Sequence, residues 1–281
     1  MIINTNVSSI TAQEAAKNTG NNITSSLEKL STGLKINKAS DDASGLAIAD
    51  KLRTQATSID QGIDNGNSAI TLLQIADKSM AEQSNILDTV KAKLIQANTA
   101  TTSSAGRNAI AADVSKLLTQ LNNIAKQTNY NGTQLISGTD GKTASTALDF
   151  QVGEDQTTGK ISTSAINANT SGLNLTTLSG AAKTGFSAAE AASGQTAVDK
   201  AITQLNTYRG SVGSTQNQVE SAVRNLMTQS TNVTAAESII RDVDYAQESA
   251  NFNKQNIISQ AGSYAISQAN TVQQNVLRLL Q

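Results

Sequence analysis

The sequence of 281 residues contains no cysteine, no histidine, no proline and no tryptophan, and aromatic residues make up 2% of it. Without cysteine and histidine it has no disulfides, no thiolate or imidazole metal ligands, and none of the Ser-His-Asp or Cys-His catalytic arrangements. Without proline, no helix is interrupted by that residue and no prolyl isomerisation slows folding. These absences argue against an enzyme, and we expect no catalytic residue, no cofactor and no metal.

Charge and hydropathy exclude further classes of protein. The formal net charge is −1, and no basic cluster is interleaved with aromatic residues, so no nucleic-acid partner is expected. No run approaches the ~20 apolar residues of a membrane-spanning helix, so no membrane insertion is expected. The N-terminal residues lack the basic and apolar regions of a general secretory signal peptide. The carboxylate pairs Asp41/Asp42 and Asp242/Asp244 are expected to cap helices or mark junctions, not to bind a cation.

The two ends of the chain carry apolar residues at helical spacing but have almost no charge. The segments Met1–Leu27 and Ser249–Gln281 contain only four charged residues, Glu14, Lys17, Lys254 and Arg278. A lone surface helix usually presents a charged face to water, whereas these segments offer Gln, Asn and Ser. Such ends are expected to stay disordered until other copies cover their apolar stripes. This pattern predicts assembly.

Long helices are predicted between the ends. Apolar residues recur at helical or seven-residue spacing from about Ser44 to Ala97, a length of roughly 80 Å at 1.5 Å per residue. A second helix covers Ile110 to Ile124 and ends at the turn signal Asn129–Gly132. A later seven-residue repeat implies a left-handed supercoil with these residues in its core. Its members are Val198, Leu205, Val212, Val219, Leu226, Val233 and Ile240.

The segment Gly138–Gly194 differs in composition and is rich in Gly, Thr, Ser and Ala. Leu148–Val152 alternates like a strand, and Lys160–Ile166 is a weaker second case, which together predict a hairpin. Asn167–Gly194 is nearly low in complexity and is expected to be partly irregular. The charged run Arg241–Tyr245 is expected to mark a junction before the neutral C-terminal helix.

Several long segments resemble bacterial flagellin. They are IINTNVSSITAQ (Ile2–Gln13), LEKLSTGLKINKASDDASGLAIADKLR (Leu27–Arg53), AAESIIRDVDYAQESANFNK (Ala235–Lys254) and SQAGSYAISQANTVQQNVLRLLQ (Ser259–Gln281). Motifs in this order at both ends are more specific than a single short pattern. The C-terminal segment and Leu73–Lys93 look most like flagellins of the Campylobacter and Helicobacter group.

The resemblance implies a mainly α fold: a long antiparallel helical coiled-coil rod from both chain ends, a small β-hairpin region, and little or no outer domain. Residues 1–42 and 241–281 would form the two halves of an inner helical domain. Residues 43–137 and 195–240 would form the two parts of a rod domain, and residues 138–194 the β-hairpin and a short variable outer segment.

The resemblance also implies a function and a set of partners. The chain would be a secreted, extracellular subunit of the flagellar filament, the propeller for swimming. Its partners would be many copies of itself in a helical homopolymer, the flagellar type III export apparatus with an export chaperone, and the filament cap and hook-junction proteins. The alternatives are a hook–filament junction protein and, from another class, a monomeric secreted helical adhesin or binding module. An enzyme is the weakest alternative.

The residues expected to pack subunit against subunit lie on the apolar stripes of the two ends. They are Ile3, Ile10, Ile23, Leu27, Leu30, Ile257, Ala261, Val272, Val276, Leu279 and Leu280. Packing within one chain is an equally good interpretation of each, because both roles would use the same stripe.

Many flagellins carry a segment that an innate immune receptor recognises, and Leu87–Gln96 corresponds to it here. The arginine of that pattern is replaced by Thr89 and its acidic residue by Ala92, so weak or no recognition by the receptor is expected. The altered segment comprises Leu87, Thr89, Val90, Lys91, Ala92 and Lys93.

Hydroxyl side chains are dense between Thr157 and Ser193, and related flagellins carry O-linked sugars on such residues. The candidates are Ser171, Thr176, Thr177, Ser179, Thr184, Ser187 and Ser193. The composition of a solvated loop is the simpler interpretation of any one of them.

Overall fold

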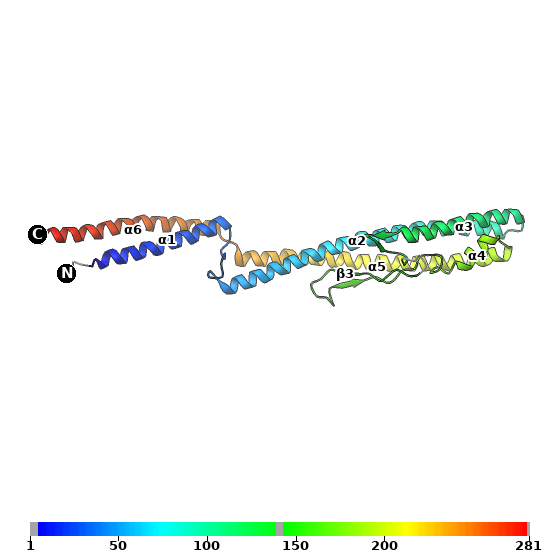
Figure 1. Cartoon of the computed structure of the whole chain (residues 1–281), viewed down its shortest axis with the longest axis horizontal. Coiled ribbons are helices and arrows are strands. Elements are labelled where there is room, and N and C mark those ends of the chain that lie inside the picture. Colours follow the sequence, from blue (N-terminus) through cyan, green and yellow to red (C-terminus); the bar gives the residue numbers. More distant parts are fainter. Residues whose placement is uncertain (1–4, 139–142, 280–281) are drawn as a thin grey trace. The chain divides into compact units, whose positions relative to one another are not determined.

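The computed structural model describes residues 5–138 and 143–279, with side chains described as far as Asn275 (Figure 1). Helices dominate: α1 (Val7–Thr32), α2 (Ala43–Asn98), α3 (Ser104–Gln127), α4 (Thr176–Thr184), α5 (Ala188–Arg241) and α6 (Tyr245–Leu279). Two antiparallel hairpins join β1 (Asn129–Tyr130) to β2 (Thr133–Gln134) and β3 (Asp149–Gln151) to β4 (Lys160–Ser162). The mainly α fold class is confirmed, and α2 matches the predicted helix to within one residue at each end.

Contacts divide the chain into two compact units, and each combines segments from both halves of the sequence. Unit 1 comprises Met1–Ala56 and Thr231–Gln281, and unit 2 comprises Thr57–Ser230. The helices α1 and α6 belong wholly to unit 1, and α3, α4 and both hairpins belong to unit 2. The helices α2 and α5 contribute residues to both units.

In unit 2, α2 and α5 pack antiparallel around an apolar core. Arg209 donates to Asp77 over 2.9 Å, and Lys91 pairs with Asp199 over 2.6 Å. The residue numbers of the α5 partners therefore decrease as those of α2 increase, which shows that the helices are antiparallel. The core is aliphatic, because its largest fully buried side chains are mainly leucines. Fully buried members include Leu73, Met80, Leu87, Leu94, Leu118, Leu121 and Leu205.

The seven-residue repeat of α5 is buried through most of its length. The members from Val198 to Leu226 are buried, whereas Val233 and Ile240 are only half-buried. The change falls where α5 passes from unit 2 into unit 1. The predicted core role of the repeat is therefore confirmed in unit 2, and the repeat is less deeply buried in unit 1.

The β3–β4 hairpin, predicted from the strand pattern, packs on α2 through a glycine notch. A Cβ atom at Gly62 would lie 2.2 Å from the carbonyl oxygen of Val152, whereas one at Gly66 would lie 2.4 Å from a methyl group of Val223 on α5. Only glycine leaves room for the hairpin backbone to approach the helix this closely. Val152 is buried there.

The expectation that Asn167–Gly194 is partly irregular is confirmed for residues 167–175, while most of the remainder is helical. Residues 176–184 form α4, and α5 begins at Ala188. Helix α4 lies against α3 and buries Leu178 and Ala182, so tertiary packing overrides a composition poor in large apolar residues. The start of α5 is fixed by a capping box, since the backbone N–H of Ser187 donates to the Glu190 carboxylate and that of Glu190 donates to Ser187 Oγ.

The loop that precedes α4 is buried and is held by side chains of α2 and α3. Gln83 is fully buried, and its Nε2 donates to the carbonyl oxygens of Leu121 and Ala168 at 3.1 and 2.8 Å. The backbone N–H of Thr170 donates to Asn122 Oδ1 at 2.9 Å. These bonds replace the hydrogen bonds that regular secondary structure would supply to a buried backbone.

Candidate subunit-packing surface

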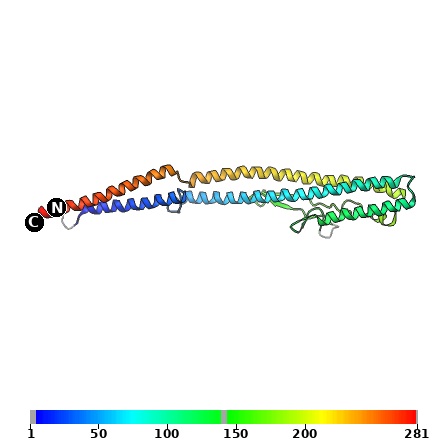
Figure 2. The same ribbon diagram turned by 90° about the horizontal axis from the view of Figure 1, so that it is seen from above.

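Helices α1 and α6 lie side by side in both views and pack antiparallel in unit 1 (Figures 1 and 2). Their facing residues recur at alternating intervals of three and four, the spacing of a coiled coil. We call this set the seam. In α1 it comprises Ser9, Ala12, Ala16, Thr19, Ile23, Ser26 and Leu30, and in α6 it comprises Glu248, Phe252, Gln255, Ser259, Gly262, Ile266, Ala269 and Gln273.

The seam is built mainly from small and polar side chains. Ser26 Oγ donates to Glu248 Oε1 over 2.5 Å, and Asn6 Nδ2 donates to the carbonyl oxygen of Ala269 over 3.0 Å. A Cβ atom at Gly262 would lie 3.8 Å from that of Ala16, an ordinary contact. The two helices thus come close together while burying little apolar surface, so the hydrophobic contribution to their pairing is small.

Seven other large apolar side chains of the same two helices lie off the seam and are exposed. We call them the outer stripe. Its members and their exposed fractions are Val7 62%, Ile10 54% and Leu27 55% in α1, and Ile257 67%, Ile258 42%, Tyr264 81% and Val272 52% in α6. Fully burying one such aliphatic side chain stabilises by about 1.5–3 kcal/mol. A single chain leaves most of that stabilisation unrealised.

The residues predicted to pack subunits therefore separate into two sets. Ile23 and Leu30 lie half-buried on the seam. The exposed members are Ile10, Leu27, Ile257, Ala261 and Val272. Ile3 and Leu280 lie outside the described residues, as do the side chains of Val276 and Leu279. The roles that the sequence could not distinguish thus fall on different faces, and subunit packing by the exposed set stays a prediction.

Sequence reasoning missed members of both faces. Val7 and Ile258 of the outer stripe were overlooked although they are apolar. The buried residues Ser9, Thr19 and Ser26 were overlooked because an apolar search does not register hydroxyl side chains. The seven-residue spacing of small residues in α1 was the available signal.

Two connectors of unit 1, residues 33–42 and 242–244, are joined by backbone hydrogen bonds. The N–H of Lys35 donates to the carbonyl oxygen of Arg241 at 2.7 Å, and that of Val243 donates to the carbonyl oxygen of Gly33 at 3.0 Å. Gly33 has φ 75°, a left-handed conformation that suits glycine at a helix C-terminus. The predicted junction at Arg241–Tyr245 is confirmed.

Carboxylates near these connectors cap helices as predicted. Asp42 Oδ1 accepts a hydrogen bond from the Gly45 N–H at 2.9 Å, and Asp244 Oδ1 accepts one from the Ala246 N–H at 2.9 Å. Backbone N–H groups of Lys38 and Asn37 donate to Asp41 and hold the pKa of its carboxyl below the usual value. Across residues 5–138 and 143–279, acidic side chains do not gather into groups of three that could hold a metal ion.

The altered receptor segment is partly buried in unit 2. Leu87 and Val90 are fully buried, whereas Thr89 and Ala92 are exposed. Lys93 pairs with Asp113 over 2.8 Å, and this contact lowers the pKa of the Asp113 carboxyl. The two substituted positions are therefore available to a partner, while the aliphatic ones belong to the core of unit 2.

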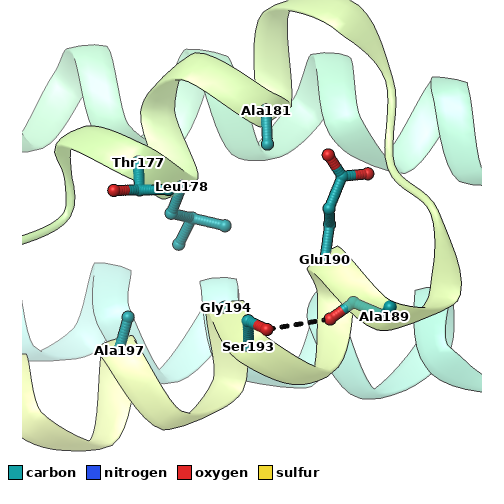
Figure 3. Close-up of a pocket in the computed structure, with 8 residues that line it drawn as sticks. All are labelled: Thr177, Leu178, Ala181, Ala189, Glu190, Ser193, Gly194 and Ala197. Atoms are coloured by element: carbon teal, nitrogen blue, oxygen red, sulfur yellow. Dashed lines mark hydrogen bonds between the residues drawn. The ribbon is translucent and has the colours of Figure 1, made fainter.

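A small pocket of about 260 Å³ lies between α4 and α5 (Figure 3). It is lined by the predicted sugar acceptors Thr177 and Ser193, and mostly by small or aliphatic residues such as Leu178 and Ala197. The Ser193 hydroxyl donates to the Ala189 carbonyl oxygen over 3.0 Å, as drawn. The residues that line this pocket include no pair of charged side chains and no set of metal ligands, so the lining shows no catalytic arrangement.

The other predicted sugar acceptors differ in exposure. Ser171, Thr176 and Thr184 are exposed, Ser179 is half-buried, and Ser187 is exposed but caps α5. The structure thus leaves most of these hydroxyls open to solvent. Their modification stays a prediction.

Within the part of the chain that the structure describes, every helix is too short in its apolar run to cross a membrane. The outer stripe is thus an apolar surface on helices that otherwise carry polar residues.

Comparisons with known proteins identify the family. Residues 3–141 match the bacterial flagellin N-terminal helical region, and residues 195–280 match the bacterial flagellin C-terminal helical region. The chain is 32% identical over 292 residues to the flagellar filament 33 kDa core protein of Treponema phagedenis, covering all of both chains. It is 48% identical over 136 residues to flagellin B of Helicobacter pylori, covering 48% of this chain and 26% of that protein.

A solved structure supports the fold. The putative flagellar hook-associated protein from Vibrio parahaemolyticus matches with a TM-score of 0.60 at 13% identity, covering 72% of this chain and 99% of that one. The predicted resemblance, including the likeness to a Helicobacter flagellin, is confirmed. This chain belongs to the bacterial flagellin family.

Proposed function

We propose that this chain is the structural subunit of a flagellar filament and that the outer stripe of α1 and α6 is the surface that neighbouring subunits cover. The observation that carries the proposal is the separation of two faces on one helix pair. The seam is mainly small and polar, although it includes a few large apolar residues such as Ile23 and Leu30, and most of the exposed large apolar side chains lie outside it. A helix pair made for a monomer would place those side chains in its seam.

The separation gives each face its own role in assembly. The seam sets the register of α1 against α6 through its spacing and its Ser26–Glu248 hydrogen bond. The outer stripe supplies the free energy of association, at about 1.5–3 kcal/mol for each side chain that neighbours fully bury. Head-to-tail contacts that do not close on themselves generate an open helical polymer, and repetition of the stripe in every subunit offsets the cost of association, about 4–15 kcal/mol.

The family supports an extracellular filament as the place of action, and we propose finer assignments on that basis. Residues 1–42 and 241–281 would form the innermost layer, residues 43–137 and 195–240 the surrounding rod, and residues 138–194 the outward-facing segment. Export through the flagellar type III apparatus with a chaperone, and contact with cap and hook-junction proteins, belong to the same proposal.

Weak recognition by the innate immune receptor is a separate part of the proposal. The exposed positions Thr89 and Ala92 lack the arginine and the acid of the recognised pattern. Restoring both with Thr89→Arg and Ala92→Glu should raise signalling in a receptor reporter assay, with Asp88→Glu as a matched exposed control. Full signalling by the unaltered chain would contradict this part and leave the filament proposal untouched.

The filament proposal is tested by seeded polymerisation. Ile257→Ser removes a stripe side chain that is 67% exposed, and Gln260→Ser alters an exposed polar neighbour on the same helix. We expect Ile257→Ser to raise the critical concentration at least about tenfold, equivalent to 1.4 kcal/mol, and Gln260→Ser to leave it unchanged. Electron microscopy and sedimentation measure the polymer, and circular dichroism checks that both monomers keep their helices. Normal growth of Ile257→Ser filaments would overturn the proposal.

A further inference from the structure

The chain contains the dipeptide Asn-Gly twice, and the structure places the two copies in opposite environments. Asn131–Gly132 forms the tip of the β1–β2 hairpin, and Asn65–Gly66 lies inside α2. An asparagine followed by glycine is the pair in which a side-chain amide is most open to attack by the next backbone nitrogen, because glycine has no side chain to obstruct the approach. The two copies therefore allow the effect of structure on the same dipeptide to be compared.

The hairpin copy is exposed and sterically unhindered. Asn131 and Gly132 are both exposed, with φ values of 48° and 82°, as a type I′ turn requires. A Cβ atom at Gly132 would meet nothing within 4 Å. In the described part of the chain, neither end of the Asn131 side-chain amide is held by another residue. The strands it joins are two residues long, and a two-stranded hairpin of this size opens readily.

The helical copy is held at both ends of its amide. Asn65 Nδ2 donates to the Gln151 carbonyl oxygen over 2.9 Å, and Asn65 Oδ1 accepts from Gln61 Nε2 over 3.1 Å. Gly66 is buried within α2, where its backbone nitrogen is fixed in the helical ladder. Ring closure at Asn65 therefore needs local unfolding of the helix first.

We propose that Asn131 is a site of spontaneous deamidation and that Asn65 is protected from it. The backbone nitrogen of Gly132 loses its proton to solvent base and forms a bond to Cγ of Asn131, and the Cγ–Nδ2 bond breaks to release ammonia. Water then opens the cyclic imide at either carbonyl carbon and leaves aspartate or isoaspartate. No oxidant or reductant takes part, and solvent water is the only co-reactant.

The products change the hairpin in two ways. Either product adds one negative charge, so the formal net charge moves from −1 to −2. The isoaspartyl product also inserts a side-chain carbon into the backbone at the first turn position. A two-residue type I′ turn fixes strand register through its backbone geometry, so the isoaspartyl form should lose the Tyr130–Thr133 pairing.

The test uses the full chain as a dilute monomer, so it does not depend on filament assembly. The chain is incubated at mildly alkaline pH, either folded or unfolded in guanidinium chloride, and then digested under acidic conditions. Mass spectrometry measures the amide-to-acid conversion at each dipeptide, and isoaspartyl methyltransferase labelling identifies the isomer. Asn131→Ser removes the reacting amide, and Asn131→Asp supplies the mass and charge standard.

We expect Asn131 to react about 100-fold faster than Asn65 in the folded chain, since reaction at Asn65 waits for helix opening. In guanidinium chloride the two rates should converge. A folded-state ratio below about tenfold, which is 1.4 kcal/mol of protection, would overturn the proposal. So would an Asn131 that stays intact in the folded chain while both sites react in guanidinium chloride.

Discussion

The helix pair of unit 1 and the helices of unit 2 use the same spacing of facing residues to different ends. In unit 2 the facing positions hold large aliphatic side chains such as Leu87 and Leu205, which are buried to 1% exposure or less. In the α1–α6 pair they hold mostly Ser, Thr, Ala, Gly and other polar residues. The few large apolar members, such as Ile23 and Leu30, are only half-buried, and other aliphatic residues lie outside. Periodicity decides which residues face each other, and the size of those residues decides whether the pair is stable alone.

The seven-residue repeat of α5 shows the same contrast within one helix. Its members are buried as far as Leu226, and Val233 and Ile240 lose part of their burial in unit 1. Unit 2 thus has the core of an independently folded domain. Unit 1 buries its repeat less deeply, which is what the proposed coverage by neighbouring subunits requires.

The largest expected effect comes from truncating one leucine in each unit. Leu87→Ala removes a fully buried side chain and should destabilise unit 2 by about 2–5 kcal/mol. Leu27→Ala removes a side chain that is 55% exposed and should change monomer stability by less than about 0.5 kcal/mol. Urea denaturation followed by circular dichroism measures both. Equal losses would erase the distinction between the units.

A pair of glycine substitutions tests how tightly unit 2 is packed. Gly62→Ala places a methyl group against the Val152 backbone oxygen and should cost about 1–3 kcal/mol. Gly210→Ala meets nothing within 4 Å on exposed helix and should stabilise by about 0.5–1 kcal/mol. Thermal unfolding of both variants shows directly whether each substitution raises or lowers the stability. A stabilising Gly62→Ala would show that the hairpin does not hold its position on α2.

A smaller effect is expected at the seam of unit 1. Ser26→Ala leaves the Glu248 carboxylate without its donor and should weaken the α1–α6 pair by about 1 kcal/mol. The adjacent Ser25 is exposed, so Ser25→Ala serves as the control. Helicity at rising urea concentration, monitored by a probe placed in α6, reports the difference. Identical urea midpoints for Ser26→Ala and Ser25→Ala would show that the hydrogen bond does not set the register of the pair.

The smallest effect is a loss of stability in acid that both units share. Backbone N–H groups of Lys38 and Asn37 lower the pKa of Asp41 in unit 1, and the Ser187 N–H lowers that of Glu190 in unit 2. A folded-state pKa below the unfolded value means that the stabilisation is complete above the unfolded pKa and is lost as pH falls through the folded one. The loss therefore falls below about pH 4.

Replacing each carboxylate by its amide separates the two contributions. Asp41→Asn should reduce the acid sensitivity of unit 1 alone, and Glu190→Gln that of unit 2 alone. Denaturation midpoints between about pH 6 and pH 3 measure the change. An unaltered pH dependence in both variants would remove these carboxylates from the explanation.

Much of the fold could be predicted from the sequence because long apolar repeats are insensitive to local detail. The limits of α2, the β3–β4 hairpin and the junction at Arg241–Tyr245 all follow from pattern. Helix α4 did not, because its nine residues contain Gly and four hydroxyl side chains and are held by packing on α3. The Ser187–Glu190 capping box was readable in the sequence and was overlooked.

The candidate site was only half predictable. Apolar residues such as Leu27 and Ile257 could be found by periodicity, but the face on which they lie could not, because a seam made mainly of small and polar residues gives a weak hydropathy signal. The two faces separate only when α1 and α6 are placed together. Side-chain size at the seam, together with the apolar stripe, is what supports the proposal that neighbouring subunits complete this core.

Hydrogen exchange of the chain as a dilute monomer and then as polymer tests the central claim most directly. We predict that amides of α1 and α6 exchange much faster than those of α2 and α5 in unit 2 while the chain is monomeric, and that they become protected on polymerisation. Equal protection of both helix pairs in the dilute monomer would contradict the claim that unit 1 is completed by its neighbours.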